Sequence, residues 1–190
     1  EVWKAIGSIH FAEEAIQSPF YSTTSCLTAI EGGDGFGKVP SKCSFRADVR
    51  IPPQVSAEKF LTRARDCVEQ FRAQNPKTSV TIELEDKEEP FETDKSSVLV
   101  RSFMWAIRKV TSRPAVLARK TGTGDINAFA AAVKRPMIAY GPGDSYLDHS
   151  PDEYVSVREY LEAIRVCGDA LNKLVELDAR RTLSHGSIPK

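Results

Sequence analysis

One histidine of this chain stands among acidic residues, in a loop where it could bind a metal. His149 lies in the stretch GPGDSYLDHSPDEYV (141–155), next to Asp148 and close to Asp152 and Glu153. A neutral imidazole whose second ring nitrogen is held by a carboxylate is a good zinc ligand. The chain has only three histidines, and none of them is in an HExxH or paired-histidine motif. A surface histidine is therefore the alternative interpretation, and the residues alone leave a metal site incomplete.

Two further groups could bind an anion. The glycine-containing loop KTGTGD (120–125) precedes an expected helix, and its backbone amides could hold a phosphate or a carboxylate. The alternative is a tight turn whose glycines need a positive φ. Arg50 closes the polar face of an expected strand just before the sequence IPP. A solvated charge at the strand end is the alternative for this arginine.

Composition and charge narrow the function classes. The chain has 190 residues, 41% of them hydrophobic and 27% charged, and its formal net charge is zero. A balanced charge disfavours a nucleic-acid or anionic-membrane role. The four cysteines show no CxxC spacing, so we expect reduced thiols in a cytoplasmic setting rather than a zinc-thiolate site or disulfides. The first residues read as the middle of a helix without an initiator methionine, which indicates a piece of a longer protein.

The first half of the chain predicts a small α+β module. We expect the elements in the order helix, strand, strand, helix, strand, which is a ferredoxin-like module without its first strand. Alternation of apolar and polar residues carries the strand predictions, and Ser56 is the expected cap of the second helix. The expected ranges are 1–17, 23–33, 42–50, 56–75 and 79–85. The acidic stretch EDKEEPFETD (85–94) is predicted to be a solvated linker.

The second half predicts alternating helices and strands. Such alternation is typical of an α/β layer with a mainly parallel sheet, in which ligands bind beyond the carboxyl ends of the strands. Both the 120–125 loop and the loop that holds His149 follow such a strand. A capping box of Ser156 and Glu159 opens the last helix. The expected helices cover 96–111, 126–133 and 156–177, and the expected strands cover 114–119 and 136–140.

Three of these segments together resemble a known enzyme family. RADVRIPP, KTGTGDINAFA and YGPGDSYLDHSPDEYV are similar to the second half of the zinc-dependent aminoacylase, acetylornithine deacetylase and succinyl-diaminopimelate desuccinylase metallopeptidases. Within that family the similarity is greatest to the lysine/ornithine hydrolases that act on an amino-group carrier protein. The resemblance implies an α/β fold with two domains: a lid or dimerisation domain over 1–88 that lacks its first strand, and the C-terminal part of the catalytic domain over 89–190.

The resemblance also implies roles for particular residues. His149 corresponds to a metal ligand of a two-metal zinc site, where cobalt or manganese could replace zinc. The substrate carboxylate would be held by Arg50 and by the turn Gly122, Thr123, Gly124 and Asp125. The implied activity is hydrolysis of an N-acyl amino acid or a carrier-protein conjugate, with a homodimer formed through the lid.

The sequence departs from the family pattern in two respects. Gly37 stands where the family has an asparagine that contacts the substrate. The other metal ligands, the glutamate base and the lid histidine of the family also have no counterpart, so we assign no catalytic residue in this chain. The alternative is a non-catalytic fragment or truncated homologue that dimerises through the lid sheet.

Overall fold

The computed structural model describes residues 1–14, 17–33, 35–148 and 150–185, with side-chain surroundings up to residue 180. These residues form two compact units. The first contains Glu1–Glu92 and Arg119–Ala131, and the second contains Thr93–Ala118 and Ala132–Lys190. The predicted division into two domains after residue 88 stays a prediction. In the structure, the segment 119–131 belongs to the first unit.

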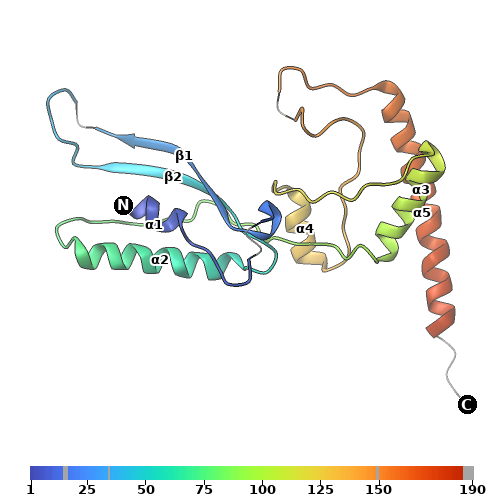
Figure 1. The fold of residues 1–190 in the computed structure, drawn as a ribbon, viewed down its shortest axis with the longest axis horizontal. Helices are drawn as coiled ribbons and strands as arrows, with labels where there is room; N and C mark the ends of the chain where they lie inside the picture. Colours follow the sequence, from blue (N-terminus) through green and yellow to red (C-terminus); the bar gives the residue numbers. More distant parts are fainter. Residues whose placement is uncertain (15–16, 34, 149, 186–190) are drawn as a thin grey trace, which may run out of the picture. The chain divides into compact units, whose positions relative to one another are not determined.

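The first unit is built on a two-stranded antiparallel sheet. Strands β1 (Thr24–Gly32) and β2 (Cys43–Arg50) pair from Thr24 opposite Arg50 to Gly32 opposite Cys43, with an irregularity between Leu27 and Ala29 (Figure 1). The two strands predicted from alternation are confirmed. Cys43, the first residue of β2, is exposed.

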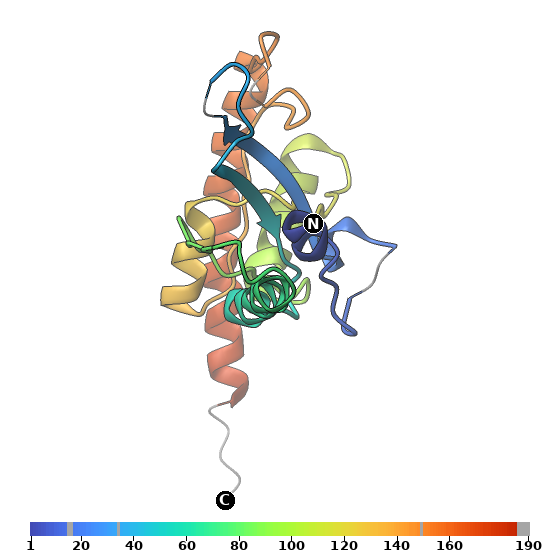
Figure 2. The same ribbon diagram turned by 90° about the vertical axis from the view of Figure 1, so that its left-hand side faces the viewer.

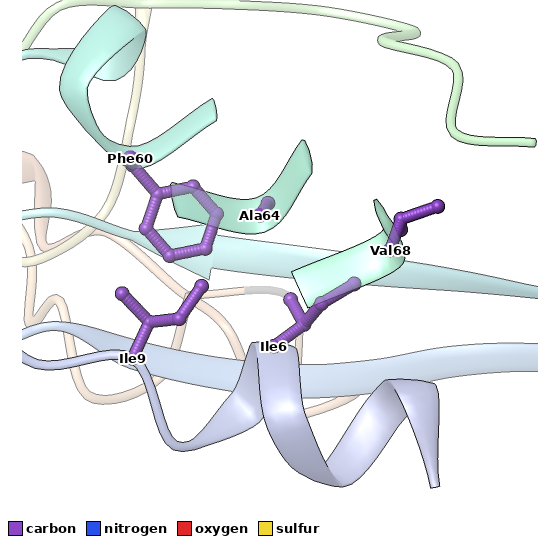
Figure 3. Packing of buried hydrophobic residues seen from close by; sticks show 5 residues of the cluster. All are labelled: Ile6, Ile9, Phe60, Ala64 and Val68. Carbon is purple, nitrogen blue, oxygen red and sulfur yellow. The ribbon is translucent and has the colours of Figure 1, made fainter. Parts of the chain in front are cut away.

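Two helices cover this sheet and supply the core of the first unit. Helix α1 (Val2–Gly7) packs against β1 and against α2 (Ala57–Gln74), which Figure 2 shows nearly end-on. The predicted cap of α2 is confirmed, because the Ser56 hydroxyl accepts a hydrogen bond from the Lys59 amide at 3.2 Å. The buried cluster consists of Ile6, Ile9, Phe60, Ala64 and Val68 (Figure 3).

Helix α1 is shorter than the helix predicted over residues 1–17. The segment after α1 is held instead by hydrogen bonds to the buried carboxylate of Glu14. Glu14 has a fully buried side chain and accepts hydrogen bonds from the backbone amides of Phe11 at 3.0 Å and Thr23 at 2.9 Å. It also accepts bonds from the Thr23 hydroxyl at 2.5 Å and from His10 Nδ1 at 3.0 Å. These bonds join the segment after α1 to the start of β1, with the short 3-10 helix η1 (Pro19–Tyr21) between them.

The second unit rests on one pair of helices. Helix α3 (Val98–Thr111) packs along α5 (Val157–His185) through Ala106, Val166 and Ala170, which are all fully buried. Phe103, Ile107 and Val110 cover this contact. Both helices were predicted, although α5 continues past the expected end at residue 177.

Helix α4 (Asp125–Val133) confirms the predicted short helix after the glycine-containing loop. One of the two hydrogen bonds of the predicted capping box at α5 is formed: the Glu159 amide donates to the Ser156 hydroxyl at 3.5 Å.

Three predicted strands are absent, and with them the expected parallel sheet. Residues 79–85, 114–119 and 136–140 form no ladder among the described residues, in which the only sheet is that of β1 and β2. Ile82 and Leu84, the apolar residues of the alternating stretch 79–85, are 37% and 51% exposed rather than buried. A strand satisfies its backbone groups only when a neighbour pairs with it, so an alternating pattern without such a neighbour stays irregular.

Candidate substrate-binding site

The polar face of β2 presents Arg50 at the end of the strand. Alternate residues of a strand point to the same side, so Arg46, Asp48 and Arg50 share this face. Arg50 Nη2 donates a hydrogen bond of 2.9 Å to Asp48 Oδ2, and Arg50 Nε forms an ion pair of 2.7 Å with Asp48 Oδ1. This two-point contact fixes the plane of the guanidinium, while the Arg50 side chain stays 38% exposed.

The structure brings Arg50 together with the glycine-containing loop. Arg50 Nη1 donates a hydrogen bond of 2.5 Å to the hydroxyl of Thr123, which is 73 residues away in sequence. Both residues belong to the first unit. A guanidinium has five N–H groups: one on Nη1 donates to Thr123, one on Nη2 donates to Asp48, and the Nε group faces Asp48 in the ion pair. Among the described residues, the second N–H group on each of Nη1 and Nη2 has no acceptor, so these two groups are available to an exposed anion.

The loop itself adopts an ordinary backbone. Neither Gly122 nor Gly124 has a positive φ, so the tight-turn explanation for these glycines does not apply. A Cβ atom at Gly124 would meet no atom within 4 Å, and one at Gly122 would meet only the Lys120 side chain, at 3.5 Å. The loop is therefore open to solvent on the side of both glycines.

A short network closes the loop at its C-terminal side. The Gly124 amide donates to Asn127 Oδ1 at 3.2 Å, and Asn127 Nδ2 donates to the backbone oxygen of Glu89 at 3.0 Å. Asp125, the remaining predicted residue of the turn, is the first residue of α4. Because the Gly124 amide is engaged, the Thr123 hydroxyl and the free N–H groups of Arg50 are the polar groups best placed to meet a ligand.

The predicted metal ligand His149 lies outside the described residues. The described residues contain no group of three or more His, Cys, Asp or Glu side chains that could hold a metal ion. The described residues therefore do not form a metal centre by themselves. Gly37, the departure from the family pattern, has φ 77°, in the left-handed region that glycine and asparagine tolerate best.

Three residues that contact the predicted groups or their neighbours in sequence were not among the predicted ones. Asp48 could have been found, since it lies two positions before Arg50 on the same strand face. Asn127 and Glu92 contact residues that are distant in sequence and come close only in the folded chain. Glu92, for example, forms an ion pair with Arg119 Nε at 2.7 Å. Acidic residues in a charged run carry no sequence signal of such partners.

Comparison with known proteins identifies the family. The model of Peptidase family M20/M25/M40 matches residues 4–173. The chain belongs to this family. Its α/β fold class is confirmed by a solved structure, the M20 family metallo-carboxypeptidase Sso-CP2 from Sulfolobus solfataricus, with a TM-score of 0.68 and 21% identity over 91% of this chain and 41% of that one.

Curated M20 relatives match parts of the chain. A Pyrococcus furiosus protein with the provisional name LysW-lysine/LysW-ornithine hydrolase is 47% identical over 46% of this chain and 27% of its own length. The LysW-lysine/LysW-ornithine hydrolase of Sulfurisphaera tokodaii is 29% identical over 77% of this chain and 39% of its own length. The chain thus spans well under half the length of these relatives. No helix among the described residues is long and apolar enough to cross a membrane.

Proposed function

We propose that this M20 chain is the C-terminal portion of a metal-dependent amidohydrolase. The enzyme releases an amino acid of the lysine or ornithine type from an N-acyl or LysW carrier-protein conjugate. Membership of a peptidase family supports the hydrolase class. The names of the relatives from Pyrococcus furiosus and Sulfurisphaera tokodaii support the substrate class.

The observation that carries the proposal is the contact between Arg50 and Thr123. A guanidinium with two free N–H groups in one plane suits a carboxylate, which accepts two parallel hydrogen bonds. The Thr123 hydroxyl adds a third polar group beside it. In this proposal, Arg50 and the turn of Gly122, Thr123, Gly124 and Asp125 hold the α-carboxylate of the released amino acid.

The metal part of the proposal concerns His149. We assign it as one ligand of a two-metal centre whose other ligands lie outside this chain, with zinc as the expected metal. Such a centre supplies an activated water when it is loaded. In the intact gene product, His149→Ala should lower the bound metal by one ion per chain, measured by mass spectrometry of the metals, whereas His185→Ala should leave it unchanged. Equal metal content in both variants would refute the assignment.

The carboxylate site is tested by a matched pair of substitutions in the intact gene product. Arg50→Lys should reduce kcat/KM for N-acetyl-L-lysine by about 10-fold or more, because an ammonium cannot reproduce the planar fork. The same change at Arg46, which shares the strand face and pairs with Glu85 at 2.9 Å, should have no effect. The analogue of N-acetyl-L-lysine whose α-carboxylate is replaced by a carboxamide should be a poor substrate for the wild type, Arg50→Lys and Arg46→Lys alike. Equal kcat/KM values for Arg50→Lys and Arg46→Lys would remove Arg50 from the site.

The homodimer is the remaining part of the proposal. The two-stranded sheet of the first unit leaves an outer edge on each strand, and unpaired edges recruit other strands. We therefore infer that the intact protein dimerises through this sheet.

A further inference from the structure

We propose that Glu92, bound by Tyr21 and Arg119, is a positioning residue that holds the glycine-containing loop so that Thr123 stays beside Arg50. The inference rests on the proposed carboxylate site, and all of the residues involved belong to the first unit. It gives a role to the acidic 85–94 stretch, whose sequence predicts only a solvated linker.

Glu92 fixes the N-terminal side of the loop. Its carboxylate accepts a hydrogen bond from Arg119 Nε at 2.7 Å, and the Tyr21 hydroxyl lies 2.8 and 2.9 Å from its two oxygens. The Arg119 guanidinium also lies 5.2 Å from the centre of the Tyr21 ring. Arg119 directly precedes Lys120, the first residue of the loop. The residue that precedes the loop, Arg119, is therefore held by Glu92 and by the Tyr21 ring.

The charges in this cluster are balanced. Partial burial raises the pKa of Glu92, but the hydrogen bonds from Arg119 and Tyr21 outweigh this effect, so the net pKa lies below its ordinary value. Glu92 is thus ionised and paired with Arg119 at neutral pH. Because its charge is compensated, this carboxylate can stand near the proposed site without repelling an anionic substrate.

The same acidic stretch also fixes the C-terminal side of the loop. The backbone oxygen of Glu89 accepts the hydrogen bond from Asn127, which in turn binds the Gly124 amide. The Glu89 carboxylate accepts a hydrogen bond of 3.1 Å from the amide of Ala57, the first residue of α2. A carboxylate at this place caps the helix N-terminus. Glu89 itself is therefore anchored to the helix that carries the core.

Thr123 stands midway between the two anchors at Arg119 and Asn127. A loop that is fixed at both ends before the ligand arrives loses less conformational entropy on binding. Removing one anchor should therefore weaken ligand binding more than the chemical step. This expectation separates a positioning role from a catalytic one.

The test uses Glu92→Gln in the intact gene product, with Glu88→Gln as a control in the same stretch, where the carboxylate has no side-chain partner among the described residues. Hydrogen exchange measured by mass spectrometry reads the peptide that covers 120–127 directly, without substrate. Glu92→Gln should speed exchange there by about 10-fold, and Glu88→Gln should leave it unchanged. Tyr21→Phe, which keeps the Glu92–Arg119 ion pair, should give a smaller increase and covers the case in which Glu92→Gln does not fold.

Steady-state kinetics give the second readout. Glu92→Gln should raise KM for N-acetyl-L-lysine by about 5-fold while kcat stays within 2-fold. Unchanged exchange in 120–127 for both Glu92→Gln and Tyr21→Phe would overturn the inference, as would a fall in kcat at constant KM. Failure of the carboxylate site itself shows separately, as wild-type protein that hydrolyses the acid and the carboxamide equally well. Exchange alone then decides whether Glu92 positions the loop.

Discussion

The two units of the chain bury their apolar side chains in different ways. In the first unit, α1 and α2 pack on a sheet, and the cluster around Phe60 combines segments from both helices and from the residues between α1 and β1. In the second unit, α3 and α5 meet along a seam whose central residues are Ala106, Val166 and Ala170. Small residues let two helices approach closely, but they bury little area each.

This difference has a consequence for the candidate site. Arg50, Thr123 and their anchors all belong to the first unit, where sheet, helices and acidic stretch are joined by side-chain hydrogen bonds. The second unit, which contains the segment around His149, has its buried cluster between α3 and α5 in the part of the chain that the structure describes. The part proposed to bind the substrate carboxylate should therefore stay ordered under conditions that loosen the part proposed to bind metal.

The largest expected effect is that of Phe60→Ala. This side chain is 7% exposed and belongs to the first cluster, where it lies beside Ile9 (Figure 3), so its loss should reduce the free energy of unfolding of the first unit by about 3–5 kcal/mol. Hydrogen exchange resolved by peptide should show faster opening of α2. Exchange in α3 and α5 should not change. Equal acceleration in both units would mean that they unfold together and would remove the contrast.

A smaller effect is expected for Glu14→Gln, which also depends on pH. Burial raises the pKa of Glu14, and the hydrogen bonds from Thr23, His10 and Phe11 more than offset this, so the net pKa is lowered. A carboxylate with a lowered pKa contributes stability above its unfolded pKa and loses it as the pH falls through its folded pKa. Glu14→Gln should cost about 2 kcal/mol at neutral pH.

The cost of Glu14→Gln should shrink as the pH falls below the ordinary titration range of glutamate. Urea unfolding of both proteins at several pH values measures this directly. Glu58→Gln, on the exposed side of α2 where Glu58 pairs with Arg65 at 3.3 Å, is the control and should cost little at any pH. A Glu14→Gln penalty that does not change with pH would show that the ionised form is not what stabilises the segment.

The smallest expected effect is that of Lys109→Met in the second unit. Lys109 pairs with Asp169 at 2.7 Å across the two helices, but its side chain is 51% exposed. An exposed ion pair of this kind contributes about 0.5 kcal/mol, and less at high salt. Thermal unfolding in low and high salt checks both points. A loss of several kcal/mol would show that the helix pair depends on this ion pair rather than on its apolar seam.

The sequence predicts a strand correctly where a neighbouring strand is available to pair with it. Strands 24–32 and 43–50 alternate and lie next to each other in sequence, so each pattern meets a neighbour and becomes a strand. The stretch 79–85 alternates equally well, yet it forms no ladder with any of the described residues. Helices depend on bonds within their own segment, which is why α2, α3, α4 and α5 all agree with the sequence-based ranges to within a few residues, apart from the far end of α5.

Some residues of the candidate site could likewise be predicted from the sequence, and others could not. Arg50 and Thr123 were predicted from motifs, and the hydrogen bond between them joins the two motifs in space. The role of Glu92 could not be predicted, because its partners are Tyr21, 71 residues before it, and Arg119, 27 residues after it. A charged run in a sequence does not show which of its members finds such a partner.

The most direct test of the central claim is to locate where a carboxylate ligand protects the wild-type protein from hydrogen exchange. The intact gene product is titrated with L-lysine and, as the control, with L-lysine amide. If Arg50 and Thr123 hold the carboxylate, L-lysine should slow exchange in the peptides covering 46–52 and 120–127, and L-lysine amide should not. Protection by both ligands alike, or protection confined to α3 and α5, would contradict the assignment of Arg50 and Thr123 as the carboxylate site.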